Sequence, residues 1–331
     1  MIKHRIQIIH HSLLTFFLIG TDIHIAKSFL ERGELVAIPT ETVYGLAGNA
    51  LDEKAVAKIF AVKNRPTFDP LIVHTYSTDK IHEFVDEFPP KAQRLAEHFW
   101  AGAMTLLLPK KAIIPDLVTA GLPTVAVRIP KHPLALRLLE SLSFPVAAPS
   151  ANPFGYISPT TAQHVAAQLG DKIPYILDGG NCNVGIESTI IGFEDEKVII
   201  YRLGGISVEA IEQVVGKVIV KSHSTSNPNA PGRLESHYAP KKPLYLDEEI
   251  LEKFTPEEIG VLSFSEYLPC IPQANQCILS LRKDYLEAAQ NLFSMMRKLD
   301  AMPVKVIFAK LLPEESLGRA INDRLRRASV K

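Results

Sequence analysis

The sequence predicts an α/β protein of two domains, with a twisted sheet that mixes parallel and antiparallel strands. Short apolar runs typical of buried strands are interspersed with segments of helical periodicity, without the strict alternation of a doubly wound fold. The chain has 331 residues, 47% of them hydrophobic, which is enough for two cores. Between Lys221 and Pro243, serine, asparagine, proline and histidine replace apolar residues, a composition typical of a linker between domains.

The first domain opens with a helix and a buried strand. Asp22–Arg32 carries apolar residues at helical spacing, and Leu35–Ile38 reads as a short strand. Asp52 is a candidate N-cap for the next helix, which Pro66 prevents from continuing. The further segments predicted as helices are Lys80–Phe88, Pro90–Phe99, Leu134–Leu142, Thr160–Leu169 and Ser207–Val215. Those predicted as strands are Leu71–His74, Thr105–Leu108, Thr124–Ile129, Val146–Ala148, Tyr175–Leu177, Ser188–Phe193 and Val198–Arg202.

The second domain is smaller and is also α/β. Its predicted strands lie near Leu244 and at Ile259–Phe264 and Val304–Phe308, and its predicted helices at Asp284–Leu299 and Leu317–Val330. We therefore expect a main domain at 21–220, a linker or lid at 221–243 and a C-terminal domain at 244–331, with residues 1–20 as an extension before them.

The extension superficially resembles a signal peptide, because Lys3, His4 and Arg5 precede the apolar run Leu13–Ile19. No A-x-A-like cleavage site follows, and the run is too short to span a bilayer. We expect a non-essential extension or an upstream start rather than export.

Charge and cysteine content exclude several classes of function. Lysine and arginine together number 36, as do aspartate and glutamate, so no global field draws the chain to nucleic acid or to a membrane. Any RNA contact would therefore be weak and local. The three cysteines, Cys182, Cys270 and Cys277, form no close pair, which favours reduced thiols in the cytoplasm over disulfides or a zinc site.

Polar side chains gather where the predicted strands and helices end. After the first strand, Pro39 interrupts the ladder, and the polar run Thr40–Thr42 follows. Strand ends of an open α/β sheet often carry a ligand site, although an ordinary exit into a loop explains the same pattern. The other polar residues at element ends are Arg65, His74, Arg128, Ser150, Ser188 and Arg202. Together they suit a polyanion bound beside a small amino or carboxyl compound.

Several of these signals have a structural alternative. Lys63 and Arg65 either clamp a phosphate or face the negative end of a helix dipole. Arg128, near the end of an apolar strand, must meet a ligand carboxylate or a structural partner. The turn around Ser150 is either a plain tight turn or a contact for phosphate oxygens. Ser158 stands before a proline, as a helix N-cap does, and such a helix start can also bind an anion.

Motifs of covalent catalysis and of the familiar phosphate-binding loops do not stand out. The chain has neither G-x-x-x-x-G-K-[ST] nor G-x-G-x-x-G, and shows no HExxH, Ser/His/Asp order or paired-carboxylate spacing. The polar residues at the ends of the predicted strands and helices favour binding and positioning of ligands over a covalent intermediate.

The strongest signal is a series of motifs in order along the chain. They are PTETVYGLAGNA (39–50), KIFAVKNRP (58–66), PLIVH (70–74), TAGLPTVAVRIP (119–130), AAPSAN (147–152), SPT (158–160), DGG (178–180), ESTI (187–190), YRLGG (201–205), HYAP (237–240) and GRAINDRLRRAS (318–329). On these motifs the chain resembles the YrdC-type threonylcarbamoyl-adenylate synthases in their long two-domain form, over about residues 21–331.

This resemblance implies a fold and an activity. The expected fold is a YrdC-like twisted mixed sheet with a concave, positively charged cavity, followed by a smaller Rossmann-like domain. The expected enzyme is a cytoplasmic nucleotidyltransferase that joins L-threonine, bicarbonate or CO2, and ATP, with Mg²⁺, to give threonylcarbamoyl-AMP and pyrophosphate. A separate transferase complex would use this product to modify the adenosine beside the anticodon of tRNA.

The resemblance also implies roles for individual residues. The threonine site would be lined by Thr40, His74, Arg128, Ala148 and Ser188. ATP would be held by Arg65, Asp69, Thr124, Ser150, Asn152, Ser158, Arg202 and Tyr238. Lys63 and Arg65 would act in catalysis by stabilising charge, and no residue is assigned as a metal ligand.

Two positions depart from many relatives. Asp69 stands where an asparagine is common, which favours contact with a phosphate through a magnesium ion over a direct one. The tyrosine often found two residues before His237 is absent, and Tyr238 is the candidate to replace it. We expect the linker to lie across the cavity mouth as a lid.

Two other functions stay open on the sequence. One is an RNA-binding module whose concave basic face holds RNA without chemistry. The other is an adenylate-forming enzyme that takes another amino acid. Threonine- and bicarbonate-dependent release of pyrophosphate from ATP would distinguish all three.

Overall fold

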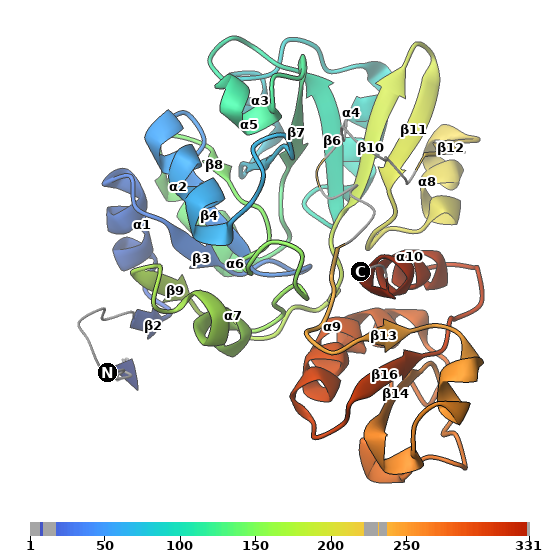
Figure 1. Cartoon of the computed structure of the whole chain (residues 1–331). Helices are drawn as coiled ribbons and strands as arrows, with labels where there is room; N and C mark the ends of the chain where they lie inside the picture. The colour runs from blue at the N-terminus through green and yellow to red at the C-terminus, as the bar shows by residue number, and fades with distance from the viewer. Residues whose placement is uncertain (1–6, 9–17, 222–230, 232–236, 330–331) are drawn as a thin grey trace.

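The structure is a computed structural model that describes residues 7–8, 18–221, 231 and 237–329. Two α/β units make up this part of the chain, a larger one before the linker and a smaller one after it (Figure 1). The larger unit is built on one sheet with the strand order β1-β2-β9-β3-β4-β8-β5-β7-β6-β10-β11-β12. The predicted fold class, a mixed sheet followed by a smaller α/β domain, is confirmed.

The elements of the main domain follow the chain in alternating groups of strands and helices. The strands are β1 (Gln7–Ile8), β2 (Leu18–Gly20), β3 (Val36–Ile38), β4 (Gly45–Asn49), β5 (Ile72–His74), β6 (Met104–Pro109), β7 (Thr124–Arg128), β8 (Val146–Ala147), β9 (Tyr175–Leu177), β10 (Thr189–Glu194), β11 (Lys197–Arg202) and β12 (Ile219–Val220). The helices are α1 (Ile23–Glu31), α2 (Glu53–Lys63), α3 (Thr78–Ile81), α4 (Pro90–Phe99), α5 (Asp116–Thr119), α6 (Pro133–Ser141), α7 (Ala162–Leu169) and α8 (Val208–Val215).

Parallel and antiparallel pairs are mixed in the main sheet. β5 is parallel to β7 and β6 is parallel to β10, whereas β6 and β7 run antiparallel. The register of β5 and β7 places His74 beside Arg128 at the end of both strands. Two of the predicted site residues are therefore neighbours because of the strand pairing itself.

Helices bury apolar residues against the sheet. The main core packs α2, α4, α7 and α8 onto it and includes Val56, Leu95 and Ile211. A second cluster packs α1 and α6 through Leu30 and Leu138. Both clusters bury the apolar positions that give these helices their periodicity, and this burial is the main source of stability for the frame around the strand ends.

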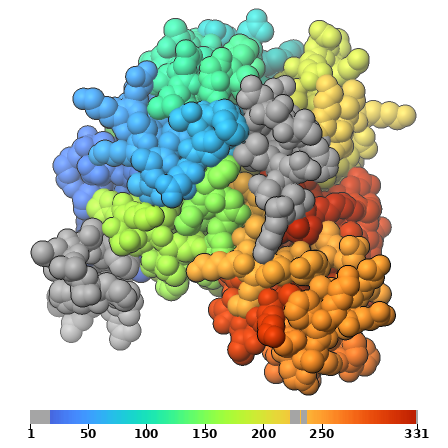
Figure 2. All heavy atoms as spheres, in the orientation of Figure 1, coloured from blue at the N-terminus to red at the C-terminus, as the bar shows by residue number. Residues whose placement is uncertain are grey.

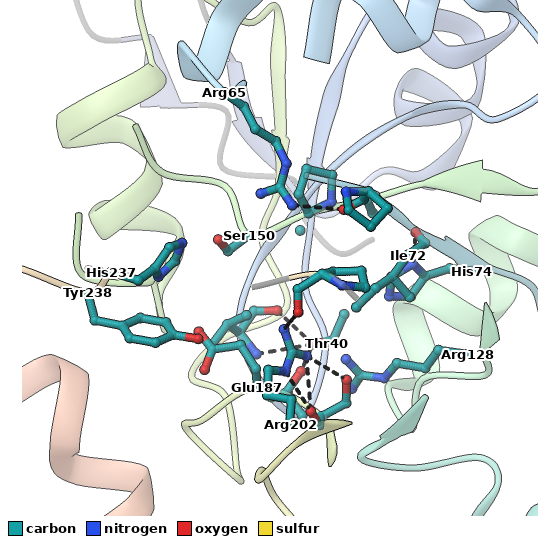
Figure 3. Close-up of a pocket in the computed structure, with 18 residues that line it drawn as sticks. Thr40, Arg65, Ile72, His74, Arg128, Ser150, Glu187, Arg202, His237 and Tyr238 are labelled. Carbon is teal, nitrogen blue, oxygen red and sulfur yellow. Dashed lines mark hydrogen bonds between the residues drawn. The ribbon is translucent and has the colours of Figure 1, made fainter. Parts of the chain in front are cut away.

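Local signals set the ends of α2, which leads into the predicted site. Asp52 caps the helix as predicted, because its carboxylate accepts the backbone N–H of Lys54 at 2.9 Å. Asn64 ends the helix in the left-handed conformation, with φ of 52°. The chain leaves the helix at this turn, and Arg65 points toward the other labelled residues of the site (Figure 3).

Two predictions about helices are wrong. The helix predicted at Lys80–Phe88 ends early, at Ile81. From Asp86 the backbone N–H donates to the carbonyl oxygen of Pro109 at 2.9 Å, so the chain pairs with the end of β6 and does not continue the helix. Ser158 does not cap the helix that follows it. The N-cap of α7 is Thr161, whose side chain accepts the backbone N–H of His164 at 3.1 Å.

The predicted extension contains a strand of the main sheet. β2 pairs in parallel with β9, with Leu18 opposite Tyr175. The sheet therefore begins before residue 21, and the long separation of the paired segments hides this from a sequence pattern. The division into domains otherwise stays a prediction.

The C-terminal domain is a parallel sheet with helices. Its strands β13 (Leu244–Tyr245), β14 (Ile259–Ser263), β15 (Gln276–Ile278) and β16 (Val306–Ala309) lie in the order β13-β16-β14-β15. All three neighbouring pairs are parallel, as a Rossmann-like domain requires. Its helices are α9 (Tyr285–Ala301), α10 (Gly318–Ser329) and the short 3₁₀ turns η1 (Glu248–Glu252), η2 (Pro256–Glu258) and η3 (Gln273–Asn275). Within the described ranges, no helix combines the length and the apolar character needed to cross a bilayer.

The two domains share a hydrophobic core. Val43, Ile157 and Ile186 of the main domain lie in one cluster with Leu292 of α9 and Ile321 of α10. Figure 2 shows the atoms of the two domains in direct contact, and α10 lies on the side of the C-terminal domain that faces the main domain (Figure 1). The predicted lid at 221–243 falls largely outside the described residues, which here are 221, 231 and 237–243.

Candidate active site

One cavity of the described structure collects polar side chains from distant parts of the chain (Figure 3). The predicted site residues that line it are Thr40, Arg65, His74, Arg128, Ala148, Ser150, Ser188, Arg202 and Tyr238. The predicted site residues outside the lining are Lys63, Asp69, Thr124, Asn152 and Ser158. Hydroxyl and guanidinium groups from separate strand ends therefore do converge on one hollow.

Arg202 and Ser188 form a fixed corner of the cavity. The Nε and Nη2 atoms of Arg202 donate to the backbone oxygen of Ser188 at 3.1 and 3.0 Å, and Nη2 also donates to its Oγ at 3.1 Å. The Ser188 Oγ lies 2.7 Å from Oγ1 of Thr105 on β6. Burial lowers the pKa of Arg202 to about 10, so the group stays cationic at neutral pH.

Arg128 has a structural partner. Its Nη2 reaches Oε1 of Glu41 at 2.7 Å, and Oε2 of Glu41 accepts the backbone N–H of Lys131 at 2.9 Å. Both side chains are buried, so the ion pair offsets the desolvation free energy of a guanidinium at the end of an apolar strand. The sequence left a ligand carboxylate and a structural partner open for Arg128; the structure provides the structural partner and also leaves Arg128 in the cavity lining.

His74 is held neutral beside Arg128. Burial, reinforced by the nearby Arg128 charge, lowers its pKa to about 3. Its Nδ1 lies 3.1 Å from the carbonyl oxygen of Ile72. A neutral imidazole presents one donor and one acceptor, which suits positioning of a ligand better than charge neutralisation.

Thr40 organises the loop after β3. Its Oγ1 donates to the carbonyl oxygen of Val43 at 2.6 Å and accepts the backbone N–H groups of Thr42 and Val43 at 3.1 and 3.2 Å. The hydroxyl proton is thus already engaged within the turn, and the side chain contributes an oxygen and a methyl group to the lining.

Asp69 supports Arg65 and does not line the cavity. Its Oδ2 lies 2.9 Å from Nη2 of Arg65, and its backbone oxygen accepts from Nε at 3.1 Å. The same Nη2 donates to the carbonyl oxygen of Pro70 at 2.8 Å. The carboxylate is fully buried behind the arginine, so the structure gives it the role of orienting Arg65 rather than of facing a phosphate.

Lys63 and Asn152 fasten the turn that carries Ser150. The Nζ of Lys63 donates to the backbone oxygens of Ser150 and Asn152. The Asn152 amide donates to the carbonyl oxygens of Pro153 and Tyr156, each at 2.8 Å. Burial and the neighbouring arginine lower the pKa of Lys63 well below its usual value. These side chains shape the wall from behind.

Thr124 and Ser158 also lie outside the cavity lining. Thr124 is the first residue of β7, at the opposite end of that strand from Arg128, and it pairs with Pro109. The Ser158 hydroxyl donates to Oε1 of Glu187 at 2.5 Å. No contact in the described structure brings Thr124 to the cavity, and Ser158 reaches it through Glu187.

His237 and Tyr238 form the wall on the linker side. Both are buried and line the cavity, and Tyr238 has a left-handed backbone with φ of 67°. Among the described residues, neither Nδ1 of His237 nor the hydroxyl of Tyr238 has a hydrogen-bond partner. Two buried polar atoms at a cavity wall are thus available to a ligand.

Sequence reasoning missed Glu187, which lines the cavity as its one carboxylate among the described residues. Its other oxygen, Oε2, accepts from Nε and Nη2 of Arg324 at 3.1 Å each. Burial alone would raise the pKa of Glu187, but the charges of Arg324 and Arg202 and the hydrogen bond from Ser158 outweigh burial and lower the pKa. The available signal was a carboxylate set directly before the predicted site residue Ser188.

The lining is electropositive. Arg65, Arg128 and Arg202 face the cavity, against the single carboxylate of Glu187 in the described lining. Arg65 and Arg128 are paired with Asp69 and Glu41 behind the wall, and their guanidinium groups still offer donors that suit an anionic ligand with several oxygens.

The chain is similar to known proteins over most of its length. Residues 28–204 match the family model described as telomere recombination, and residues 206–330 match the model described as the C-terminal domain of threonylcarbamoyl-AMP synthase. The chain is 41% identical to a threonylcarbamoyl-AMP synthase of Pyrococcus abyssi, over 93% of this chain and 94% of that protein. It is 40% identical to one of Bacillus subtilis, over 92% of each chain.

A solved structure has a similar fold over most of the chain. The crystal structure of Pyrococcus abyssi Sua5 complexed with L-threonine matches with a TM-score of 0.86 and 40% identity, over 93% of this chain and 94% of that one. The fold and the cavity define a two-domain protein of the YrdC-like class. On the sequence and structural matches, the chain belongs to the threonylcarbamoyl-AMP synthase family, as its motifs predicted.

Proposed function

We propose that this chain forms threonylcarbamoyl-AMP from L-threonine, bicarbonate or CO2, and ATP, with release of pyrophosphate, which makes it a nucleotidyltransferase. The observation that carries the proposal is the convergence of Arg65, Arg128 and Arg202 with the Ser150 and Ser188 hydroxyls on one cavity. The similar Sua5 structure, described as complexed with L-threonine, supports an amino-acid site in the same fold.

The threonine site would lie at the ends of β5 and β7. Arg128 would pair with the threonine carboxylate, sharing its guanidinium with Glu41, and Ser188 would read the substrate hydroxyl. His74, Thr40 and Ala148 would complete the walls. The depressed pKa of His74 supports this role, since a neutral ring beside Arg128 does not compete for the carboxylate.

The ATP phosphates would lie next to the threonine site, against Arg65, Ser150 and Arg202, and Arg202 would join the two sites through its hydrogen bonds to Ser188. The Asp69 contact aims the Arg65 guanidinium, and the Lys63 contacts fix the turn at Ser150. Lys63 and Asp69 would therefore act by positioning. The predicted ATP contacts of Thr124 and Asn152 stay predictions without support from the cavity lining.

The reaction needs positioning and charge stabilisation rather than a protein nucleophile. The neutral threonine amine attacks the carbon of CO2; a C–N bond forms, one C=O π bond breaks to leave a carboxylate oxygen, and the nitrogen proton passes to water or buffer, which gives a carbamate. A carbamate oxygen then attacks the α-phosphorus, and the bond to the β-phosphate oxygen breaks as pyrophosphate leaves. Arg65 and Arg202 would stabilise the charge that develops on the phosphate oxygens. Enclosure of the cavity would protect the carbamate and the mixed anhydride from water.

The described residues do not fit a magnesium ion held by the protein. They contain no group of three or more histidine, cysteine, aspartate or glutamate side chains placed to share an ion. Asp69, the predicted contact, is buried behind Arg65. Magnesium would therefore enter with the phosphates of ATP, and we assign no step to it.

The product would be consumed by a separate transferase that modifies tRNA. Threonylcarbamoyl-AMP is a mixed anhydride and transfers its acyl group readily, which suits delivery to an RNA amine. The equal numbers of acidic and basic residues support only weak, local contact of this chain with the RNA itself.

Pyrophosphate release from ATP tests the proposal, with threonine and bicarbonate omitted in turn. We expect release that depends on both, and threonylcarbamoyl-AMP in the products by mass spectrometry. An RNA-binding module would release no pyrophosphate, and an enzyme for another amino acid would respond to that amino acid in place of threonine. Either result would overturn the proposal.

A further inference from the structure

A buried arginine of the second domain contacts a residue of the cavity wall. Arg324 lies on α10 and is fully buried, although it belongs to the C-terminal domain. Its Nε and Nη2 each lie 3.1 Å from Oε2 of Glu187, and its Nη1 donates to the backbone oxygen of Leu203 at 2.5 Å and to Asp323 Oδ2 at 3.0 Å. Three of these contacts cross from one domain to the other.

Glu187 would be unfavourable in this cavity without a counter-charge. It is the only acidic residue in the described lining, and a bound polyphosphate would carry several negative charges past it. Like charges brought together in a partly desolvated site disfavour binding strongly. Two nitrogens of Arg202 donate hydrogen bonds to Ser188. In the described structure, the direct ion pair of the Glu187 carboxylate is with Arg324.

The same helix holds the neighbouring wall. The Tyr238 ring packs against the guanidinium groups of Arg324 and Arg327, whose central carbons lie 5.3 and 4.9 Å from its centre. The backbone oxygen of Arg327 accepts the N–H of His237 at 3.1 Å. A tyrosine with a positive φ persists only where its surroundings hold it, and α10 supplies that support.

We propose that Arg324 of the C-terminal domain neutralises Glu187 and thereby makes the cavity competent to bind the phosphates of ATP. Arg324 is a positioning residue, because it acts through Glu187 and does not itself line the cavity. The second domain is then part of the nucleotide site rather than an appendage. This inference rests on the proposed placement of ATP in the cavity.

The decisive measurement is the dissociation constant of ATP, by calorimetry on the full chain, together with the KM values for ATP and threonine. Arg324→Gln should weaken ATP binding by roughly tenfold or more, because it removes the ion-pair partner of Glu187 beside the phosphates, while the KM for threonine changes by less than about threefold. Arg326→Gln is the matched control, since Arg326 lies on the same helix in an exposed pair with Glu314. It should leave the dissociation constant of ATP and both KM values unchanged.

A second variant separates charge from folding. In Glu187→Gln/Arg324→Gln both charges of the pair are gone and the amide oxygen still accepts from Ser158, so ATP affinity should return to within about threefold of wild type. If Arg324→Gln alone does not fold, as judged by circular dichroism, this double variant decides the question. ATP affinity that stays low in the double variant, or equal losses for ATP and threonine in Arg324→Gln, would overturn the inference.

The inference and the proposed function fail in different ways. A wild-type chain that binds ATP but releases no pyrophosphate with threonine would refute the proposed function, and the binding comparison would still decide the role of Arg324. A wild-type chain that releases pyrophosphate, with ATP affinity indifferent to Arg324→Gln, would overturn the inference alone. A wild-type chain that does not bind ATP would overturn both.

Discussion

Removal of Arg128 should separate the two substrates more clearly than any other change in the cavity. Its side chain is 4% exposed and its guanidinium pairs with Glu41 at 2.7 Å, and the β5–β7 register places the residue beside His74. Arg128→Ala would delete the expected partner of the threonine carboxylate and leave Glu41 with the N–H of Lys131. Arg65 and Arg202, on the proposed phosphate wall, would stay in place.

The contacts set the size of the expected effect. A hydrogen bond between charged groups contributes about 1.5–3 kcal/mol, which corresponds to an increase of roughly 10- to 150-fold in the KM for threonine. The KM for ATP should change by less than about threefold. Breaking a buried ion pair from one side costs about 3–5 kcal/mol of stability, and the N–H of Lys131 should keep the loss near the lower end.

Initial rates of pyrophosphate release provide the assay, with threonine varied at saturating ATP and ATP varied at saturating threonine. Rates should be measured below the melting temperature of the variant, which circular dichroism gives. Arg137→Ala, on the exposed face of α6, controls for loss of a surface arginine. Equal increases in both KM values, or an unchanged KM for threonine, would refute the assignment of Arg128 to the threonine site.

Three further predictions concern the supporting frame. Asp69→Ala should loosen Arg65 and raise the KM for ATP by roughly tenfold while that for threonine stays constant; unchanged ATP kinetics would show that the 2.9 Å pair does not orient the arginine. Gly204→Ala places a Cβ 2.4 Å from neighbouring backbone atoms and should lower the free energy of unfolding by more than about 3 kcal/mol. The control Gly121→Ala, where φ is positive but space is open, should lower it by about 1 kcal/mol. Equal losses in urea titrations would contradict this. Burial lowers the pKa of His74 to about 3 from 6.5, so on acidification the unfolded chain is protonated at this residue before the folded chain is. The free energy of unfolding should therefore be unaffected by His74 above pH 6.5 and should fall by about 2 kcal/mol by pH 5. His74→Gln should remove that part of the slope in denaturant titrations, and an unaltered slope would place the titration elsewhere.

Strand-end reasoning located most of the cavity but not the direction of every side chain. Arg65, Arg128, Ser188 and Arg202 follow from polar residues at the ends of apolar runs, and the structure brings them together. Sequence spacing does not tell whether a side chain near such an end faces the hollow or the loop behind it. Lys63 turns to backbone oxygens of the neighbouring turn, and that choice depends on a chain segment about ninety positions away.

Long-range pairs account for what the sequence could not reveal. The partner of Glu187 is 137 positions further along the chain, in another domain. The place of Glu187 directly before Ser188 is the one local signal, and it does not reveal that the carboxylate is buried and paired. The same is true of β2, whose pairing with β9 becomes visible only in the sheet. Such pairs form because tertiary packing brings segments together, which local periodicity does not encode.

The apolar cluster that joins the domains has a consequence for how the molecule melts. Val43, Ile157 and Ile186 belong to one hydrophobic cluster with residues of α9 and α10. Unfolding of either domain would therefore expose apolar surface of the other. Calorimetry of the intact chain should therefore show one cooperative endotherm where two independent lobes would give two. A fragment that ends before α9 would expose these three side chains to water as a hydrophobic patch, and we expect it to aggregate.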